Sequence, residues 1–223
     1  MDRLVDSFFN VQILSQAWPL LLAGFWMTVK LTLVVVPLGL AGGLLVALCS
    51  TSRHRALRWL VIIYVDFFRA FPPLVLLMFI AFGLPFLGFS PGAFVAVALS
   101  FLLNTSSYYG EIFRAGIESI TRGQHEAARS TGLSVPQTMA YVVLPQAVKN
   151  VVPDLVSNTL EVIKLTSLAS VVALPELLYA ARQAQSLTYN ATPIIAAGII
   201  YLFCLWPLVR LLSRFEHRQV ALH

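Results

Sequence analysis

Charged residues are scarce in this 223-residue chain. Asp, Glu, Lys and Arg make up 11% of it and hydrophobic residues 58%, whereas an ordinary soluble domain carries roughly 25% charged residues. So few charges cannot cover the surface of a soluble core of this size, which excludes a soluble globular protein. A membrane-spanning helix needs about 20 apolar residues, so the chain has room for about five or six spans and for no sizeable soluble domain.

Cysteine is also rare, and its placement excludes two kinds of site. Cys49 and Cys204 both lie in apolar runs, which argues against a disulfide framework and against a CxxC metal site. The chain also lacks the G-x-x-x-x-G-K-[ST] loop that binds ATP in P-loop enzymes. We therefore expect no catalytic residue, no metal, no cofactor and no nucleic-acid partner in this chain. The N-terminus lacks the basic start of a cleaved secretory signal, so we expect it to be retained.

Apolar runs alternate with short polar or turn-rich connections along the whole chain. The longest connection, residues 111–150, separates the third apolar run from the fourth. The pattern predicts an all-α polytopic membrane protein, with residues 1–223 forming one transmembrane domain. The five predicted spans cover about residues 20–49, 59–83, 93–110, 151–174 and 193–209.

The basic residues fall mostly on one side of this predicted topology. With five spans, the first loop, the long loop and the C-terminus share one side, and the opposite side carries only Arg3 and Arg182. The positive-inside bias makes the basic side cytosolic. We therefore predict an N-out, C-in chain whose long loop faces the cytosol. Ten of its 15 Lys and Arg residues lie on that side: Arg53, Arg55, Arg58, Arg114, Arg122, Arg129, Lys149, Arg210, Arg214 and Arg218.

The long loop has the signals of two short helices joined by a sharp turn. Thr121-Arg122-Gly123-Gln124 and Ser134-Val135-Pro136-Gln137 both match the capping box that starts a helix. Gly132 lies between them, where a glycine closes a preceding helix by adopting a left-handed conformation. We expect one helix to end near Thr131 and a second to run from Val135 to about Val143. Ala127 and Ala128 would then offer a flat face to another protein, although a simple solvated loop also fits these signals.

The sequence EAARSTGLSVPQTMAYVVLP, residues 126–145, resembles the EAA loop of bacterial ATP-binding-cassette (ABC) importer permeases. Similar stretches extend the resemblance over about residues 20–215 and point to the polar-amino-acid branch of that family. The resemblance implies a permease in the bacterial cytoplasmic (inner) membrane, with a coupling helix near residues 123–135 that docks on a separate ATPase subunit. The coupling residues implied are Gly123, Glu126, Ala127, Ala128, Arg129, Gly132, Leu133, Leu144 and Pro145.

The same resemblance implies the partners of the chain. These are two ABC ATPase subunits, which bind ATP and Mg, a second permease chain in a homodimer or heterodimer, and an extracytoplasmic solute-binding protein. The lipid bilayer surrounds the permease pair. The expected function is ATP-driven import of a polar amino acid by alternating access.

Two pairs of opposite charges fall within predicted spans, Asp66 with Arg69 and Glu161 with Lys164. Each acid precedes a base by three residues, so each pair can meet on one helix face. Two interpretations stay open: the pairs only neutralise themselves and fix helix packing, or they line a path for a zwitterionic solute. Small polar residues nearby either line the same path or bridge helices. The candidate path residues are Asp66, Arg69, Asn104, Ser107, Glu161, Lys164, Thr166 and Ser167.

Three other functions compete with an importer permease. The sequence GFSPG, residues 88–92, fits the G-x-S-x-G elbow of hydrolases, but Pro91 lacks the backbone N–H that the oxyanion hole requires. A stand-alone secondary carrier or channel would explain the buried charges but would leave the helix pair of the long loop without a partner. A purely structural membrane subunit would explain neither feature.

Overall fold

The computed structural model describes residues 6–52 and 54–220, with side chains up to residue 210. Every regular element in that part of the chain is helical, which confirms the all-α prediction. Arg3 and Arg53, which contribute to the predicted topology, lie outside the described residues. The side chains of Arg214 and Arg218 also lie outside the described part.

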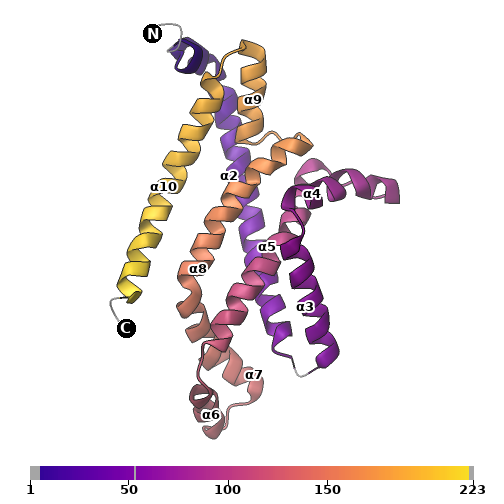
Figure 1. Cartoon of the computed structure of the whole chain (residues 1–223), viewed down its shortest axis with the longest axis vertical. Coiled ribbons are helices and arrows are strands. Elements are labelled where there is room, and N and C mark those ends of the chain that lie inside the picture. Colours follow the sequence, from indigo (N-terminus) through magenta and orange to yellow (C-terminus); the bar gives the residue numbers. More distant parts are fainter. Residues whose placement is uncertain (1–5, 53, 221–223) are drawn as a thin grey trace. The chain divides into compact units, whose positions relative to one another are not determined.

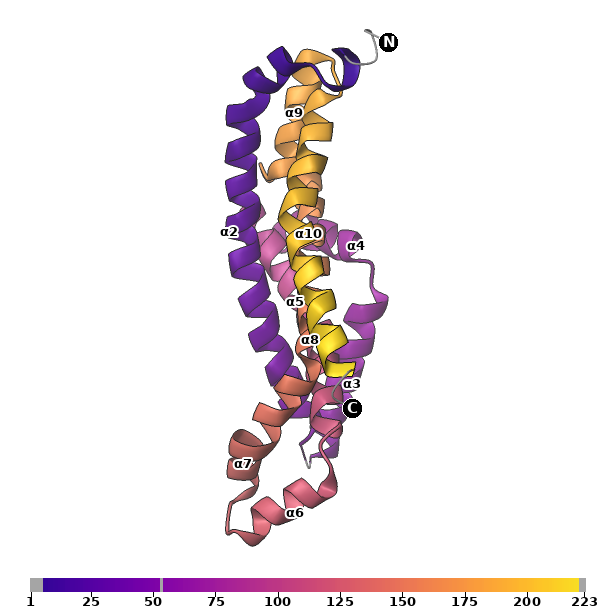
Figure 2. The same cartoon turned by 90° about the vertical axis from the view of Figure 1, so that its left-hand side faces the viewer.

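Nine helices of the described part follow one another along the chain (Figures 1 and 2). Short 3-10 or π-helical turns extend or join some of them: η1 (Phe79–Gly83) and η2 (Leu84–Leu87) follow α4, η3 (Met139–Val143) joins α7 to α8, and η4 (Thr166–Val172) extends α8. The helices are α2 (Val11–Ser50), α3 (Arg55–Ala70), α4 (Pro73–Met78), α5 (Ala93–Glu118), α6 (Arg122–Ser130), α7 (Val135–Thr138), α8 (Leu144–Leu165), α9 (Leu177–Thr188) and α10 (Thr192–Val220).

Three helical segments of the described chain are long and apolar enough to cross a membrane: Asp6–Ser50, Val135–Val172 and Thr192–Arg210. A fourth span results if Arg55–Ala70 and Pro73–Leu87 are counted together. The predicted span 59–83 is therefore broken, because two consecutive prolines after Phe71 cannot continue the hydrogen bonding of α3. The third predicted span lies in α5, whose polar stretch at residues 104–109 lowers its hydropathy. The count of five spans stays a prediction.

The chain divides into two compact units built from alternating segments. The first unit combines the described parts of Met1–Val36, Pro73–Ser100 and Leu160–His223, and the second combines Pro37–Pro72 with Phe101–Thr159. The prediction that residues 1–223 form one domain stays a prediction.

The core of the first unit forms where α9 packs against α2 and α10 (Figure 1). At Gly24 of α2 an added Cβ would lie 2.7 Å from the Ala180 Cβ of α9, so only glycine allows this close approach. Lipid is as apolar as these side chains, so between membrane helices close van der Waals packing of small residues is the main stabilising contribution. The buried residues of the first unit's core are Ala17, Leu21, Leu177, Ala181, Ala184 and Ala197.

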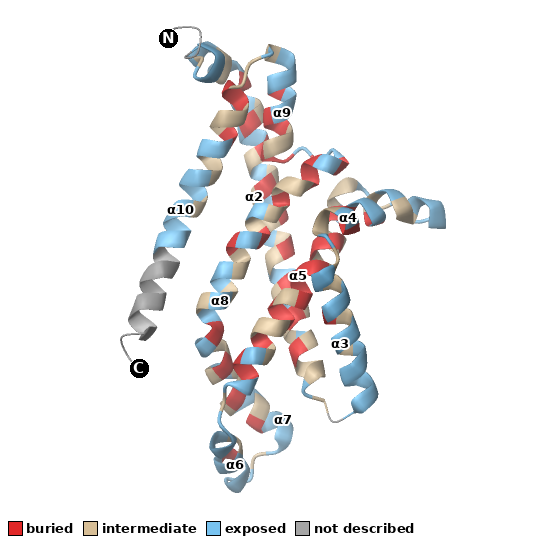
Figure 3. Cartoon of the chain, in the orientation of Figure 1, coloured by how far each residue is buried: buried red, intermediate tan, exposed pale blue. Residues whose placement is uncertain are grey.

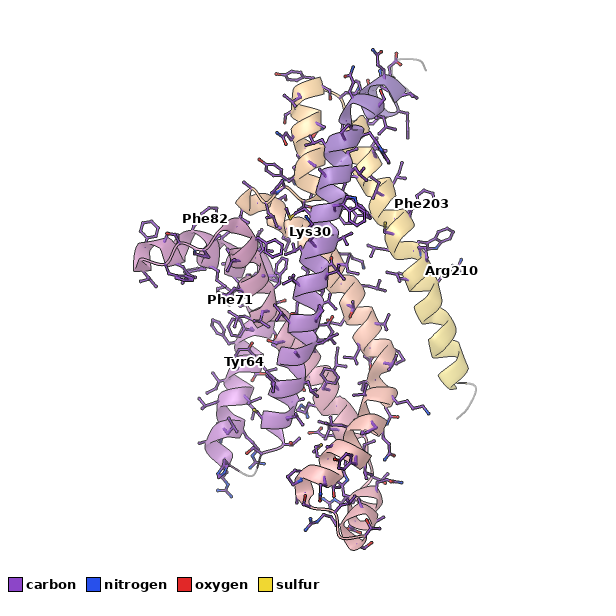
Figure 4. The ribbon with its side chains drawn as sticks, turned by 180° about the vertical axis from the view of Figure 1, so that it is seen from behind. Lys30, Tyr64, Phe71, Phe82, Phe203 and Arg210 are labelled. Carbon is purple, nitrogen blue, oxygen red and sulfur yellow. The ribbon has the colours of Figure 1, made fainter. Side chains whose placement is uncertain are left out.

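The core of the second unit forms around α5, whose inner residues are buried (Figure 3). At Gly39 of α2 an added Cβ would clash with the Thr105 hydroxyl of α5. At Gly43 it would clash with the Tyr109 Cβ, so neither position has room for a side chain. The hydroxyl of Tyr64, labelled on α3 in Figure 4, lies 2.7 Å from the Ser106 hydroxyl of α5. Small residues and hydrogen bonds therefore hold the second unit together, as is typical between membrane helices.

Candidate functional site

The long loop folds as the predicted hairpin, with α6 and α7 joined by a sharp turn. Gly132 adopts φ 89°, the left-handed conformation that a glycine tolerates without strain. The Arg129 guanidinium donates to the Leu133 carbonyl at 2.6 Å and closes the turn from the other side. The Ser134 hydroxyl accepts from the Gln137 amide, and the Gln137 side chain accepts from the Ser134 amide. These contacts confirm the turn at Gly132 and the second capping box.

Two details of the predicted hairpin are wrong. Thr121 precedes α6 but its side chain makes no capping hydrogen bond, because a matching sequence does not by itself fix the rotamer. The second helix does not stop near Val143, since η3 leads directly into α8 at Leu144. Pro145 lies inside this helical run and cannot donate a backbone hydrogen bond, and the π-helical turn η3 ends just before it. The hairpin therefore returns through one continuous helical run.

The flat, exposed face of the hairpin is smaller than the predicted one, which included both Ala127 and Ala128. Ala128 is buried and only Ala127 is exposed, so the flat face is formed by one alanine and not by both. Tyr141, which the sequence analysis did not single out, is 72% exposed on η3. Of the predicted coupling residues, those exposed are Gly123, Glu126, Ala127, Arg129, Gly132 and Pro145, while Leu133 and Leu144 are half-buried. The six exposed coupling residues are called the hairpin face below.

The predicted Asp66–Arg69 pair does not form. A guanidinium nitrogen of Arg69 lies 3.8 Å from a Glu111 carboxylate oxygen of α5, and the guanidinium stacks over the Tyr108 ring at 5.5 Å. Among the described residues no ion pair involves Asp66. The i,i+3 rule failed here because Arg69 occupies the last turn of α3, where the neighbouring helix α5 offers both a carboxylate and an aromatic face.

Glu111 belongs to a larger charged cluster at the end of α5. Arg114 binds Glu111, and a nitrogen of Arg114 lies 2.6 Å from Glu118. Hydrogen bonding to Glu111, and further to Glu118, raises the pKa of the Arg114 guanidinium above its ordinary value. Sequence analysis missed this cluster, although the spacing Glu111, Arg114, Glu118 is an i,i+3 and i,i+4 pattern on one helix.

Glu161 and Lys164 form the predicted pair at 2.6 Å on α8. Both side chains are more than half exposed, at 62% and 51%. Charged side chains are costly in an apolar environment, so this face of the chain meets either water or a partner. Ser167 donates to the Lys164 carbonyl at 2.8 Å, and the buried Thr166 donates to the Ile163 carbonyl at 2.6 Å. Both hydroxyls therefore satisfy the end of their own helix.

Asn104 and Ser107 are buried and already hydrogen bonded. The Asn104 amide donates to the Phe68 carbonyl of α3 at 3.1 Å, and Ser107 donates to the Asn104 carbonyl at 2.6 Å. The Asn104 bond joins α5 to α3, as the helix-bridging interpretation predicts, whereas the Ser107 bond stays within α5.

Comparison with known proteins agrees with the hairpin and the helical architecture. Residues 39–220 match the family described as the binding-protein-dependent transport system inner membrane component. The chain belongs to this family. It is 35% identical over 201 residues, 89% of each chain, to the probable amino-acid ABC transporter permease protein YckA of Bacillus subtilis. It is also 37% identical to the arginine transport system permease protein ArtQ of the same organism, over 82% of this chain and 84% of that protein.

A solved structure gives the same result for the fold. A crystal structure of an amino acid ABC transporter with histidines matches 92% of this chain and 96% of that chain, with a TM-score of 0.83 and 36% identity. The protein is thus the permease subunit of an ABC importer and a multi-pass protein of the inner membrane. A permease of this kind works with ATPase subunits and a second permease chain.

Proposed function

We propose that this chain pairs with a second permease chain to form the pathway by which an ABC importer moves a polar amino acid into the cytoplasm. The observation that carries the proposal is the exposed hairpin α6–α7, built within the matched family region and presenting the hairpin face to a partner. Two ATPase subunits, each holding ATP and Mg, dock on the two hairpins. A solute-binding protein delivers the amino acid from the opposite side of the membrane.

The proposed topology has five spans, with the N-terminus outside and the C-terminus in the cytosol. The second span, residues 59–83, takes in most of α3 together with α4 and η1, and the third, residues 93–110, lies within α5. Within the second unit, the α2–α3 connection and the hairpin lie at the same end in both views (Figures 1 and 2). Exposed basic residues lie in or next to these segments: Arg55 and Arg58 in the first turns of α3, Arg122 and Arg129 in α6, and Lys149 near the start of α8. The positive-inside bias supports a cytosolic location for that end.

Coupling follows from the shape and charge of the hairpin face. A small exposed residue, Ala127, lets a partner surface approach α6 closely, and Glu126 and Arg129 add one charge of each sign beside it. ATP-driven closure of the two ATPase subunits brings the two docked hairpins together. Because η3 joins the hairpin to α8 as a continuous helical run, that movement reaches the membrane directly and switches the pathway between outward and inward access.

The substrate proposal rests on the named relatives and on the charges of the permease. An amino acid carries a carboxylate and an ammonium, and the exposed Glu161–Lys164 pair offers a charge of each sign. On α3, the Arg69 side chain is 43% exposed and lies beside the acid Glu111, so this pair also offers a charge of each sign. We assign these residues to the solute path, with Asp66 and Ser167 as further candidates. Asn104, Ser107 and Thr166 stay candidates too, although their hydrogen bonds serve helix packing.

Co-purification with the ATPase tests the coupling proposal. Glu126→Lys and Ala127→Glu alter the exposed hairpin face and should reduce both ATPase recovery and amino-acid uptake, while the permease itself stays in the membrane. Lys149→Gln, an exposed charge change outside that face, is the matched control. Full ATPase recovery with both hairpin variants would contradict the docking assignment. Uptake by the chain reconstituted without an ATPase would instead identify a stand-alone carrier or channel.

A further inference from the structure

The second unit contains a cleft of about 640 Å³ that the proposed transport function does not use. It lies where the end of α2, the first turns of α3 and the end of α5 meet. Its lining combines basic, acidic and apolar side chains, among them Arg55, Arg58, Trp59, Asp66 and Arg114. Such a cleft at a helix connection is large enough to hold a polar headgroup and the start of an acyl chain.

The charges inside the cleft divide into a neutralised group and a free group. Arg114 is bound by Glu111 and Glu118, so the acids at the end of α5 already have partners. Among the described residues, no ion pair involves Arg55 or Arg58. Their spacing of three residues places both guanidinium groups on one face of α3. The mouth of the cleft therefore carries two positive charges without a counter-charge.

Asp66 is the one acid of the lining without an ion pair in the described chain. It follows Arg58 by eight residues, which is about 12 Å along a helix. A phosphate held between Arg55 and Arg58 is thus separated from this carboxylate.

The wall that α3 contributes to the cleft is otherwise mostly apolar. Val61, Ile62 and Val65 of α3 line the cleft beside Trp59, whose side chain is 64% exposed. Tryptophan is enriched where a membrane helix meets the headgroup region. Figure 3 shows exposed residues along most of α3, and Leu60, also 64% exposed, is one of its large apolar ones. An exposed apolar helix surface in a membrane protein faces lipid, so acyl chains have access to the mouth of the cleft.

We propose that this cleft binds the phosphate headgroup of an anionic phospholipid of the cytosolic leaflet. Arg55 and Arg58 hold the phosphate, Trp59 lies at the headgroup level, and the apolar wall of α3 guides one acyl chain. Basic pockets between helices on the cytosolic side suit such headgroups. The leaflet follows from the proposed topology, and to this extent the inference rests on the proposed function. Because the bound lipid touches the end of α5, it would brace the segment that leads into the hairpin.

Native mass spectrometry of the purified, delipidated full chain tests this site directly. The chain is titrated with phosphatidylglycerol and, separately, with phosphatidylcholine carrying the same acyl chains. We expect phosphatidylglycerol to bind more tightly, and the double variant R55Q/R58Q to weaken its binding about 30-fold, from the contribution of two basic residues near the membrane surface. The conservative variant R55K/R58K should keep the preference for phosphatidylglycerol. Loss of two basic residues elsewhere on the chain, tested as K149Q/R182Q, should leave that preference unchanged.

Four outcomes would overturn the site. Equal binding of the two lipids by the unaltered chain would show that the cleft does not select an anionic headgroup. An unchanged preference in R55Q/R58Q, or an equal loss in K149Q/R182Q, would show that the two arginines of α3 do not form the site. Competition by soluble glycerol phosphate at the same concentration as the lipid would identify a site for a soluble phosphate. None of these readouts depends on ATPase docking or uptake, so the lipid site and the transport function fail independently.

Discussion

Replacing Glu176 should destabilise the first unit more than any other single polar change there. Its carboxyl group is buried without exposure to solvent. It accepts hydrogen bonds from the backbone amides of Leu178 at 2.8 Å and Tyr179 at 2.7 Å, and from the Tyr201 hydroxyl at 3.1 Å. One side chain thus caps α9 and joins it to α10.

The size of the effect follows from these three contacts. Loss of an N-terminal helix cap costs about 1 kcal/mol. A buried hydroxyl left without its acceptor, as Tyr201 would be, adds about 1–3 kcal/mol. Glu176→Ala should therefore lower the free energy of unfolding by about 2–4 kcal/mol, while Glu176→Gln, which keeps one acceptor oxygen, should cost less. For a chain of this length each kcal/mol corresponds to roughly 2–4 °C in melting temperature.

Thermal unfolding of the purified permease in one detergent measures this prediction. Tyr201→Phe removes the donor together with its need for a partner and should cost about 1 kcal/mol. In the double variant the Glu176 and Tyr201 effects should be less than additive, because the two groups share one hydrogen bond. A melting temperature of Glu176→Ala equal to that of the unaltered chain, or fully additive effects, would refute the reasoning.

Three further predictions concern the second unit and the solute path. Gly132→Ala should cost the hairpin about 1–2 kcal/mol, because alanine tolerates φ 89° poorly, and ATPase co-purification should fall. The exposed Glu161–Lys164 pair should contribute less than about 1 kcal/mol, so Glu161→Gln should leave the melting temperature within experimental error but raise the KM for uptake; an unchanged KM would remove it from the path. Asn104→Leu should lower the melting temperature, because its bond to the Phe68 carbonyl is lost, and an unaltered KM for uptake would remove Asn104 from the candidate path residues.

The hairpin was predictable from sequence because its signals are local. A glycine turn and a capping box are each encoded by a few neighbouring residues. Both the turn at Gly132 and the Ser134 capping box form as predicted. Thr121 shows the limit of the same approach, since its side chain could cap α6 and does not. The rotamer of a capping residue depends on contacts that a short pattern does not contain.

The charged clusters were harder to predict because their partners come from different helices. Glu161 and Lys164 meet as their spacing on one helix predicts. Arg69 instead turns to Glu111, which follows it by 42 residues, and no periodicity along α3 contains that information. The glycines of α2 show a related limit, because Gly39 and Gly43 allow a close approach to α5 that involves residues far along the chain. Small residues in a sequence indicate that a helix packs closely against another, but they do not indicate which helix that is.

The location of the hairpin is tested most directly by accessibility labelling in intact cells. Cys49 and Cys204 are first replaced, and single cysteines are then introduced at Gly123, where an added Cβ meets nothing within 4 Å, or at Tyr189, which is 96% exposed at the end of α9. An impermeant maleimide applied from outside should label Tyr189→Cys, and should label Gly123→Cys only in inverted membrane vesicles, where the bound ATPase should protect it. Labelling of Gly123→Cys from outside intact cells would contradict a cytosolic hairpin and with it ATP-driven coupling.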